Sequence, residues 1–390
     1  MKVSVVGQGY VGLPLAIAAA NAGHTVTGID TSTALVATLA SGRSPIGDIA
    51  DSAVAGVLGT SYAITTDYAA VAGSQVVVIC VPTPLDAVHN PDLTALRSAL
   101  ESTAGGLSAG TLVIIESTVS PGTTRGLAAS ILDKAGVAYE LAYSPERIDP
   151  ANKKWNITNT PKLVAGITDG ARDRAVEFYS TFVSSVNVGS SVEVIETAKL
   201  LENSFRLINI SFINEIAGFC SKLGIDVREV IDAAATKPYG FMPFYPGAGI
   251  GGHCIPVDPS YLAATAREIG APMRFIELAN EVNLSMPSYF VGVATGILGS
   301  LSGKKILVVG IAYKPDVADM RETPAAGLIT LLRNAGAAVS WHDELVGQWN
   351  GESSTPLGSG FDLAILVNPH TGTDFGALGD TRILNTRGGY

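Results

Sequence analysis

Cysteine and charged residues are both scarce in this chain of 390 residues. Three cysteines cannot form a disulfide framework, and so few are typical of a protein from a reducing cytoplasm. Charged residues make up only 15% of the chain and hydrophobic residues 47%, which excludes a largely disordered protein. A net charge of −10 argues against a nucleic-acid partner, because no strong basic field exists to neutralise phosphates.

A long uninterrupted hydrophobic run is also lacking. Residues 3–29 contain no Asp, Glu, Lys or Arg and superficially resemble a membrane span, but five glycines punctuate them. They are better explained as strand, turn, helix and strand than as a membrane or signal segment. We therefore expect a soluble, cytoplasmic protein with no membrane partner, and the length predicts two or three domains.

The first strand is followed by a glycine pattern of the form G-x-G-x-x-G. It reads Gly7-Gln8-Gly9-Tyr10-Val11-Gly12, and an apolar helix follows it. Gly7 permits the tight turn, Gly9 lets the backbone approach a pyrophosphate, and Gly12 lets helix and strand pack closely. Free N–H groups at the helix N-terminus favour phosphate. The alternative is a glycine turn in an α/β protein without a cofactor.

The second strand ends at Asp30, at the distance where a carboxylate accepts hydrogen bonds from the ribose hydroxyls of NAD. A 2′-phosphate would be repelled there, which favours NAD over NADP. Two further strands end near Thr83 and Thr118, where ligands of parallel sheets bind. Ordinary helix capping by each threonine is the competing interpretation.

Residues 193–235 are predicted to be helical, with polar residues along one stripe and apolar residues over most of the remaining circumference. The stripe consists of Glu196, Lys199, Asn203 and Arg206. The cluster of Lys, Asn and Arg suits an oxyanion or phosphate, although such a stripe is more often a solvated face.

A glycine-rich loop precedes Cys254, with four glycines in six residues. Such a segment is neither a strand nor a helix interior, and its backbone can wrap closely around a ligand. A thiol framed by glycines, with His253 beside it and Asp258 four residues on, is a plausible nucleophile. We expect no metal site, because no second Cys or His stands at ligand spacing.

The last third of the chain predicts a second α/β domain. A strand begins near Lys304, a helix runs to about Ala335, and residues 346–360 are predicted to form a surface loop. Lys314 and Arg321 are the cationic candidates of this domain.

Four motifs occur in order: the first glycine fingerprint, E-x-x-K-L-x-E-N-x-x-R, G-x-G-x-G-G-H-C-x-x-x-D and K-P-D-x-x-D-x-R-x-x-P. Together they resemble the UDP-glucose/GDP-mannose dehydrogenase family along essentially the whole chain. The resemblance implies oxidation of the C6 alcohol of a nucleotide sugar to a carboxylate, with two NAD in sequence.

The resemblance also implies roles for individual residues. Cys254 matches the nucleophile, Lys199 and Asn203 the oxyanion stabilisers, and Asp258 the carboxylate that positions water. Thr118 and Glu146 match residues at the reacting end. The expected cofactor residues are Gly7, Gly9, Tyr10, Val11, Gly12, Asp30, Thr83, Thr118 and Arg321. The expected substrate residues are Glu146, Arg147, Ile148, Lys199, Asn203, Arg206, Tyr245, Gly249, Gly251, Tyr313 and Lys314.

The sugar is suggested by the residues that follow Ser144-Pro145-Glu146. Glucose-specific members usually have Phe there, whereas this chain has Arg147 and Ile148, which resembles the branch acting on UDP-N-acetylglucosamine or UDP-N-acetylmannosamine. UDP-glucose stays an alternative. A single-hydride dehydrogenase of the hydroxyacid type, with Cys254 structural, and a non-catalytic regulator are the rival classes.

The expected fold is α/β, with two Rossmann-like doubly wound domains joined by a long central helix. The expected division is an NAD-binding domain at 1–190, a central helical and catalytic-loop domain at 191–300, and a UDP-binding domain at 301–390. By resemblance, the central helix is also the dimerisation element of a homodimer. Two features depart from the family: the segment after Trp341 is short, and Asn385 stands where Asp is more usual. Both concern the domain that is expected to bind UDP.

Overall fold

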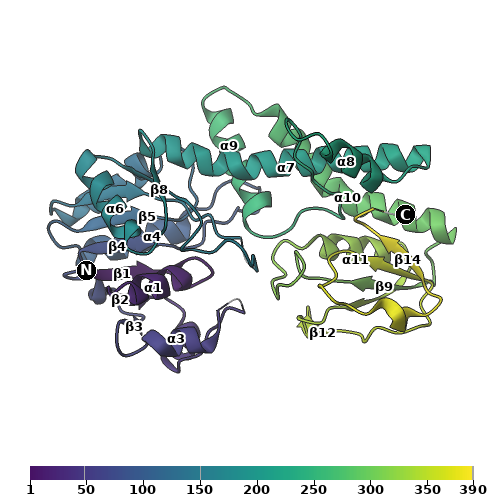
Figure 1. Ribbon diagram of the computed structural model, residues 1–390, viewed down its shortest axis with the longest axis horizontal. Helices are drawn as coiled ribbons and strands as arrows, with labels where there is room; N and C mark the ends of the chain where they lie inside the picture. Colours follow the sequence, from purple (N-terminus) through teal and green to yellow (C-terminus); the bar gives the residue numbers. More distant parts are fainter. Residues whose placement is uncertain (48, 150, 389–390) are drawn as a thin grey trace. The chain divides into compact units, whose positions relative to one another are not determined.

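The computed structural model describes residues 1–47, 49–149 and 151–388. The chain forms two compact units, each built from two stretches of sequence. The first unit comprises Met1–Glu202 and Ser260–Gly270, and the second comprises Asn203–Pro259 and Ala271–Tyr390. Figure 1 traces the chain through both units.

The first unit is built on an eight-stranded sheet. Its strands are β1 (Lys2–Val6), β2 (Thr25–Ile29), β3 (Tyr62–Thr65), β4 (Val76–Ile79), β5 (Leu112–Ile115), β6 (Glu140–Tyr143), β7 (Lys162–Gly166) and β8 (Val186–Val188). Their order is β3-β2-β1-β4-β5-β6-β7-β8, and only β7 runs antiparallel to its neighbour β6. The first six strands therefore have the Rossmann order, which reverses between β1 and β4.

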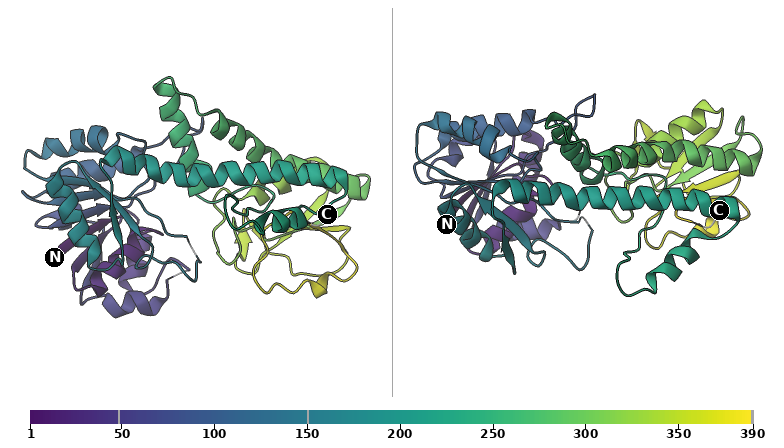
Figure 2. Two further views of the ribbon diagram at one scale, coloured as in Figure 1. Left: turned by 45° about the horizontal axis from the view of Figure 1, so that its top comes forward. Right: turned by 90° about the horizontal axis from the view of Figure 1, so that it is seen from above.

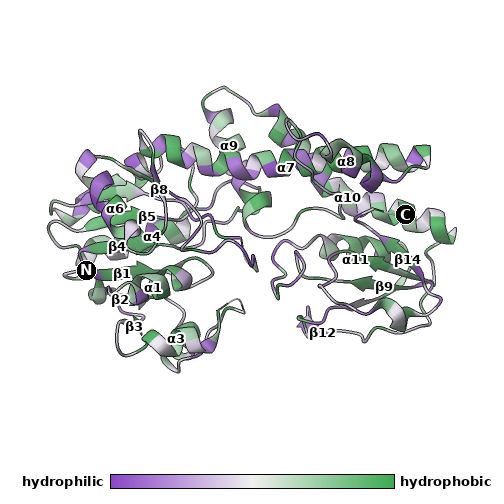
Figure 3. Ribbon diagram, viewed as in Figure 1, coloured by the Kyte–Doolittle hydropathy of each residue, from purple (hydrophilic) through white to green (hydrophobic). Residues whose placement is uncertain are grey.

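Helices cover both faces of this sheet (Figure 1), whose strands are mostly hydrophobic (Figure 3). In β1, Val3 and Val5 pack into one core while Val6 packs into the other. The long run of buried residues in the central strands is the pattern of a parallel sheet covered on both faces. The helices are α1 (Gly12–Asn21), α2 (Thr33–Ala40), α3 (Asp51–Val57), α4 (Thr94–Gly106), α5 (Ala129–Leu132) and α6 (Asp169–Ser180), with short turns η1 (Tyr68–Val71), η2 (Thr124–Ala128) and η3 (Asp133–Ala135).

The second unit contains a smaller parallel sheet in the order β10-β9-β13-β14. Its elements are β9 (Lys305–Val309), α11 (Pro324–Asn334), β10 (Ala338–His342), β13 (Leu363–Leu366), η4 (Phe375–Leu378) and β14 (Arg382–Asn385). Helices α11 and α10 (Arg274–Leu298) cover one face. The predicted surface loop at 346–360 contains a short antiparallel pair, β11 (Gln348–Trp349) and β12 (Glu352–Ser353).

Two helices pass from one unit into the other. Helix α7 (Val192–Leu223) is the long teal helix in both views of Figure 2. The predicted helical material at 193–235 is present but breaks at Gly224, where φ is +69°, before α8 (Val227–Ala235). Helix α9 (Cys254–Glu268) adds Tyr261 to the first unit, where this side chain is fully buried and donates a hydrogen bond to the Pro84 carbonyl oxygen over 3.2 Å.

Helix α7 buries polar side chains and exposes apolar ones. Glu196 and Lys199 are 0% and 4% exposed, whereas Phe212 and Phe219 are 56% and 60% exposed. The polar stripe that the sequence predicts along this helix therefore does not face open water at Glu196 and Lys199. Buried polar groups of this kind require hydrogen-bonding or charged partners.

The fold class expected from the sequence is confirmed: two α/β units with Rossmann-like sheets and a long helix between them in the sequence. Among the described residues, no helix has both the length and the apolar character needed to cross a bilayer. The three-part division of the chain stays a prediction.

Gly310 provides a test of the second sheet's packing. Its φ is +82°, and a Cβ there would collide with the backbone carbonyl of Asn368. We expect Gly310→Ala to destabilise the second unit by about 2–4 kcal/mol, from overpacking and left-handed strain. Urea unfolding followed by circular dichroism measures this. Gly347→Ala is the matched control, because a Cβ there meets nothing within 4 Å, and equal stability of the two variants would contradict the packing argument.

Candidate functional site

The glycine turn after β1 lies at the point where the strand order of the first sheet reverses. Gly7 has φ +88°, and its N–H donates to the Ile29 carbonyl oxygen over 2.8 Å. A Cβ at Gly12 would collide with the Gly7 carbonyl oxygen, so the helix start can pack there only without a side chain. A Cβ at Gly9 meets nothing within 4 Å, so the surface there is open to a ligand's approach. The turn fits a pyrophosphate at the N-terminus of α1.

Asp30 follows β2 and is held by two backbone N–H groups. They are those of Gln8 (2.8 Å) and Ser32 (2.9 Å). The Gln8 side chain is fully buried and accepts a hydrogen bond from the Tyr62 hydroxyl over 2.8 Å, which anchors the glycine turn to β3. The carboxylate of Asp30 is thus placed beside the glycine turn, where it suits the two hydroxyls of an NAD ribose.

Thr83 and Thr118 follow β4 and β5 at the same edge of the sheet. Thr83 is 3% exposed and Thr118 is half-buried. Between the two segments, the Ser117 hydroxyl donates to the Val81 carbonyl oxygen over 2.7 Å, which ties them together. The two threonines, the glycine turn and Asp30 therefore all lie at the carboxyl edge of one parallel sheet.

Glu146 and Lys199 form a buried pair in the first unit. The Lys199 Nζ lies 3.6 Å from Glu146 Oε2, and the two residues are 4% and 8% exposed. Glu146 also accepts a hydrogen bond from the Ile148 N–H. Arg147 points to other partners, since its guanidinium donates to Glu202 and to the Pro161 carbonyl oxygen, each over 2.6 Å.

Asn203 and Asp258 form a second pair, within the second unit. The Asn203 side-chain amide donates to Asp258 Oδ2 over 2.5 Å, and Asp258 is 1% exposed. Asn203 lies one helical turn after Lys199 on α7. Cys254 is the first residue of α9 and is half-buried, with Asp258 one turn further along the same helix. The sequence indicates a loop before Cys254 but not that the thiol opens a helix.

The glycine loop before Cys254 is anchored by two asparagines and by the segment at 313–322. Asn214 accepts from the Gly247 N–H over 2.9 Å, and Asn283 accepts from the Ile250 N–H over 2.7 Å. A Cβ at Gly251 would lie 2.5 Å from the Glu322 carbonyl oxygen. The glycines therefore serve internal packing, which is a reason for their presence that the sequence reasoning did not include.

The same loop lies against Tyr313. A Cβ at Gly252 would lie 2.7 Å from the Tyr313 ring, and a Cβ at Gly249 would lie 3.2 Å from Pro324. The Gly252 N–H donates to the Arg321 carbonyl oxygen over 3.0 Å. Within the second unit, the structure thus brings the predicted loop glycines together with the predicted Tyr313 segment.

The predicted cations occupy different environments. Arg321 pairs with Asp319, with a shortest distance of 2.6 Å, and Arg206 is exposed on α7. The Lys314 Nζ lies 6.0 Å from the centroid of the Tyr313 ring. Tyr245, a further predicted substrate residue, donates its hydroxyl to Asp232 over 3.2 Å.

Sequence reasoning missed a buried ion pair behind Glu146. Lys162 on β7 lies 2.7 Å from Glu116, which follows β5, and the two are 7% and 2% exposed. Lys162 also donates to the Pro145 carbonyl oxygen over 3.1 Å, so it holds the residue next to Glu146. The signal was available: Lys162 begins one apolar strand and Glu116 directly follows another, and an isolated charge is costly at such a place.

It also missed Arg387, which follows β14 in the second unit. Its guanidinium donates to Asn368 Oδ1 over 2.7 Å and pairs with no carboxylate among the described residues. Burial, and secondarily the nearby Arg228, lower the pKa of Arg387. A half-buried cation of this kind at the carboxyl edge of a parallel sheet favours an anionic ligand.

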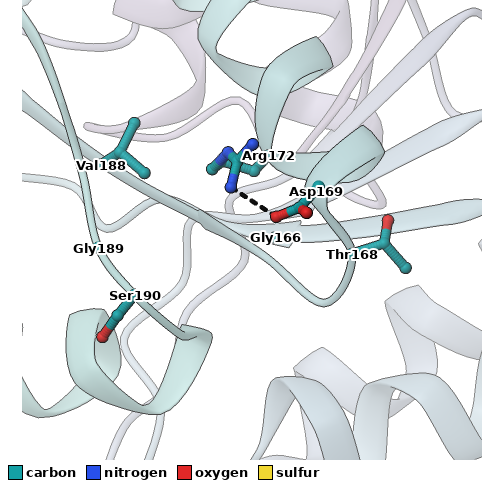
Figure 4. Close-up of a pocket in the computed structure, with 7 residues that line it drawn as sticks. All are labelled: Gly166, Thr168, Asp169, Arg172, Val188, Gly189 and Ser190. Atoms are coloured by element: carbon teal, nitrogen blue, oxygen red, sulfur yellow. Dashed lines mark hydrogen bonds and ion pairs between the residues drawn. The ribbon is translucent and has the colours of Figure 1, made fainter.

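A pocket of about 310 Å³ lies elsewhere in the first unit (Figure 4). It is lined by Gly166, Thr168, Asp169, Arg172, Val188, Gly189 and Ser190. Because β7 is antiparallel to β6, its end at Gly166 lies at the amino edge of the parallel strands, opposite the glycine turn. Asp169 and Arg172 pair with each other over 2.5 Å, and none of the predicted site residues lines this pocket.

The reversed strand order, the glycine turn at the reversal and Asp30 are the features of an NAD-binding domain of the Rossmann class. Comparison with protein families gives three consecutive matches. The NAD binding domain of the UDP-glucose/GDP-mannose dehydrogenase family matches residues 1–183, its central domain 193–285, and its UDP binding domain 307–371. The chain belongs to the UDP-glucose/GDP-mannose dehydrogenase family, as the sequence motifs predict, and it is an NAD-dependent oxidoreductase.

Similar proteins come from both substrate branches. The UDP-N-acetyl-D-mannosamine dehydrogenase of Pyrococcus horikoshii is 32% identical over 380 residues, which covers 95% of this chain and 90% of that protein. The UDP-N-acetyl-D-glucosamine 6-dehydrogenase of Pseudomonas aeruginosa is 33% identical, covering 95% and 91%. The structure of a UDP-glucose dehydrogenase from Pyrobaculum islandicum is similar with a TM-score of 0.91 at 27% identity, covering 99% and 94%.

The buried pair of Lys162 and Glu116 provides a stability test. Lys162→Met leaves the Glu116 carboxylate buried, with the Tyr179 hydroxyl as its remaining partner among the described residues. We expect a loss of about 3–5 kcal/mol in the free energy of unfolding, because an uncompensated charge stays inside. Urea denaturation measures it. The double variant Glu116→Gln/Lys162→Met should recover at least half of the loss, whereas a double variant less stable than Lys162→Met would contradict the charge argument.

Proposed function

We propose that this chain oxidises the C6 alcohol of a UDP-N-acetylhexosamine to the uronate, consuming two NAD per sugar. The substrates named for two similar proteins, UDP-N-acetyl-D-mannosamine and UDP-N-acetyl-D-glucosamine, support this choice. So does the resemblance of the segment at 144–148 to that branch of the family. The match of the UDP binding domain to residues 307–371 supports UDP as the nucleotide.

The observation that carries the proposal is the arrangement along α7. Lys199 and Asn203 stand one turn apart, and each pairs with a carboxylate, that of Glu146 or of Asp258. Because Asp258 lies one turn after Cys254 on α9, the Asn203 bond holds the helix that begins with the thiol. The first unit thus carries a lysine and a carboxylate, and the second an amide, a carboxylate and a thiol, which are the groups that oxidation and hydrolysis require.

In the first half of the reaction, the chain's task is to stabilise the oxygen on C6. NAD, when bound, accepts one hydride in each of the two oxidations. Lys199 and Asn203 are the N–H donors assigned to that oxygen, since positioned donors stabilise developing negative charge. Glu146 orients Lys199, which positions the donor before the substrate binds.

In the second half, Cys254 keeps the intermediate attached to the protein. Its sulfur adds to the C6 aldehyde to form a thiohemiacetal, whose oxidation gives a thioester. A helix N-terminus favours the thiolate form that this addition requires. Asp258 is assigned to position the water that cleaves the thioester, which releases the uronate and returns the thiol. Thr118 is assigned to the reacting end at the edge of the first sheet.

Nucleotide binding is assigned to the carboxyl edge of the second sheet. Lys314 and Tyr313 follow β9 there, and Arg387 adds a half-buried cation that the sequence reasoning did not include. The further substrate residues of the proposal are Arg147, Ile148, Arg206, Tyr245, Gly249 and Gly251. Arg321 stays assigned to the cofactor. With no disulfide among the described residues, a reducing cytoplasm suits this thiol chemistry.

UDP-glucose is the second candidate substrate. Its support is the TM-score of 0.91 with a UDP-glucose dehydrogenase structure. Both candidates share the nucleotide and the chemistry at C6, so they differ only at C2, in the acetamido group and, for UDP-N-acetylmannosamine, also in the configuration.

The first test measures NADH formed per sugar consumed, with UDP-N-acetylglucosamine, UDP-N-acetylmannosamine and UDP-glucose compared in parallel. We expect two NADH per sugar for an acetamido sugar. Cys254→Ala should abolish uronate formation because no thioester forms. Cys220→Ala, in the core beside α8, is the matched control and should retain the stoichiometry. One NADH per sugar, unchanged in Cys254→Ala, would move the chain to the single-hydride class.

We also propose that the chain forms a homodimer through α7. The side chains Leu201, Phe205, Phe212 and Phe219 are 47–61% exposed along this helix. Their spacing of four or seven residues keeps them near one face. An exposed apolar stripe of this length is typical of an interface between protein subunits.

A charged substitution in this stripe tests the homodimer. Phe212→Glu places a carboxylate among apolar side chains, so we expect the molar mass from light scattering to fall from that of a dimer to that of a monomer. Val88→Glu is the matched control, because Val88 is 72% exposed in a loop of the first unit. A wild-type chain of about 40 kDa in solution would refute the dimer.

A further inference from the structure

A buried polar network lies at the carboxyl edge of the second sheet, where the strand order reverses between β9 and β13. Three of its side chains are Asp343, Asn368 and His370, which are 3%, 7% and 8% exposed. None of them belongs to the predicted site residues. All three contact the segment that follows β9, which carries Tyr313 and Lys314.

Asp343 accepts hydrogen bonds from several members of the network. One carboxylate oxygen accepts the N–H groups of Ile311 (2.9 Å) and Ala312 (3.1 Å). The other accepts those of Leu345 (3.0 Å) and Val346 (2.9 Å). Burial alone would raise the pKa of Asp343, but the hydrogen bonds from His370 and the backbone outweigh it and lower the pKa. Asp343 is therefore an ionised carboxylate that only accepts hydrogen bonds.

His370 lies between this carboxylate and the Lys314 segment. Its Nε2 lies 2.8 Å from Asp343 Oδ1, and its Nδ1 accepts the Asp316 N–H over 2.8 Å. A backbone N–H can only donate, and an ionised carboxylate can only accept. The imidazole therefore carries its single proton on Nε2 and is neutral in this arrangement.

Residues 368–371, the stretch that contains His370, hold the Lys314 segment at further points. Asn368 donates its amide to the carbonyl oxygens of Ala312 and Tyr313, each over 3.0 Å. The Asp316 carboxylate accepts the N–H and the hydroxyl of Thr371, each over 2.7 Å. Asp316 has φ +63°, a conformation that costs a non-glycine residue free energy, so these bonds are needed to hold it.

We propose that His370 is a positioning residue that holds the Lys314 segment in its nucleotide-binding geometry, and that protonation of its Nδ1 releases the segment and weakens nucleotide binding. The assignment of Lys314 to the nucleotide rests on the proposed function above. We call the hydrogen-bonded chain from Asp343 through His370 to the Asp316 N–H the latch. Its hydrogen bonds do not depend on the proposed function.

The direction of the pH effect follows from the two nitrogens. A proton on Nδ1 faces the Asp316 N–H, so two donors would meet and the bond would be lost. The charged groups that face the imidazole are Asp343 and Glu344, which follow β10, and Asp316 on the segment. The hydrogen bond to Asp343 raises the pKa of His370 in spite of its burial. Nucleotide binding favours the neutral form, so affinity is full above this pKa and falls as the pH drops through it.

Two variants of the full chain separate the roles of the two nitrogens. His370→Asn keeps an oxygen near the Nδ1 position, which accepts the Asp316 N–H and cannot titrate. His370→Gln keeps a donor near the Nε2 position but offers no acceptor near Nδ1. A purely structural role of the imidazole would not distinguish these variants by pH.

The experiment measures the dissociation constants of UDP-N-acetylglucosamine, without NAD, and of NAD between pH 5.5 and 8.5 by calorimetry. We expect the wild type to lose about five- to tenfold in sugar-nucleotide affinity at acid pH, the scale of one hydrogen bond. His370→Asn should bind about as the wild type does at pH 8 and show no pH dependence. His370→Gln should bind the sugar nucleotide weakly throughout, and NAD affinity should change less than sugar-nucleotide affinity in both variants, because the glycine turn and Asp30 of the first unit are unaffected.

The proposal is overturned if the wild type shows no pH dependence or if His370→Asn retains it. Hydrogen exchange of the Asp316 amide without ligand tests the latch separately, since its protection should fall in acid in the wild type and not in His370→Asn. If UDP-N-acetylglucosamine, UDP-N-acetylmannosamine and UDP-glucose all fail to bind at pH 8 while this exchange behaves as expected, the proposed substrate is wrong and the latch stands. Unchanged protection in acid would reject the latch itself.

Discussion

The buried polar side of helix α7 is the constraint on which the candidate site depends. Glu196 accepts the N–H groups of Gly122 and Thr124, Lys199 pairs with Glu146, and Asn203 donates to Asp258. Each of these groups would destabilise the fold if its partner were removed, because buried polar groups are costly when unpaired. The hydrogen bonds and the ion pair that these polar groups require therefore also fix the side chains assigned to chemistry.

Local sequence patterns predicted the features that depend on residues close together in the sequence. The glycine turn after β1 requires φ +88° at Gly7 and no side chain at Gly12, and both requirements appear directly as glycine. The polar stripe on α7 was visible as a helical period. Lys199 and Asn203 were therefore predictable as neighbours on one face, and the structure gives both of them carboxylate partners. The α/β alternation predicted a parallel sheet, but the antiparallel strand β7 was not predicted.

Other features arise from contacts between residues far apart in the sequence, which no local pattern contains. Lys162 pairs with Glu116 only because β5, β6 and β7 are neighbours in the sheet. His370 contacts Asp316 because two loops meet where the strand order reverses. The glycines before Cys254 suggested a ligand loop, yet Gly251 also has a close backbone neighbour at Glu322, which only the fold reveals.

The first unit is discontinuous, and this has a consequence for how the chain is made. Met1–Glu202 includes the whole eight-stranded sheet, but Tyr261, which is fully buried, belongs to the same unit and donates to Pro84. Domains emerging from the ribosome usually fold in order from the N-terminus. Here the sheet emerges before the segment that completes its unit, so the NAD-binding unit stays unfinished until Gly270 has been synthesised. The growing chain therefore exposes the surface that Tyr261 will cover, and chaperones have access to that surface during this interval.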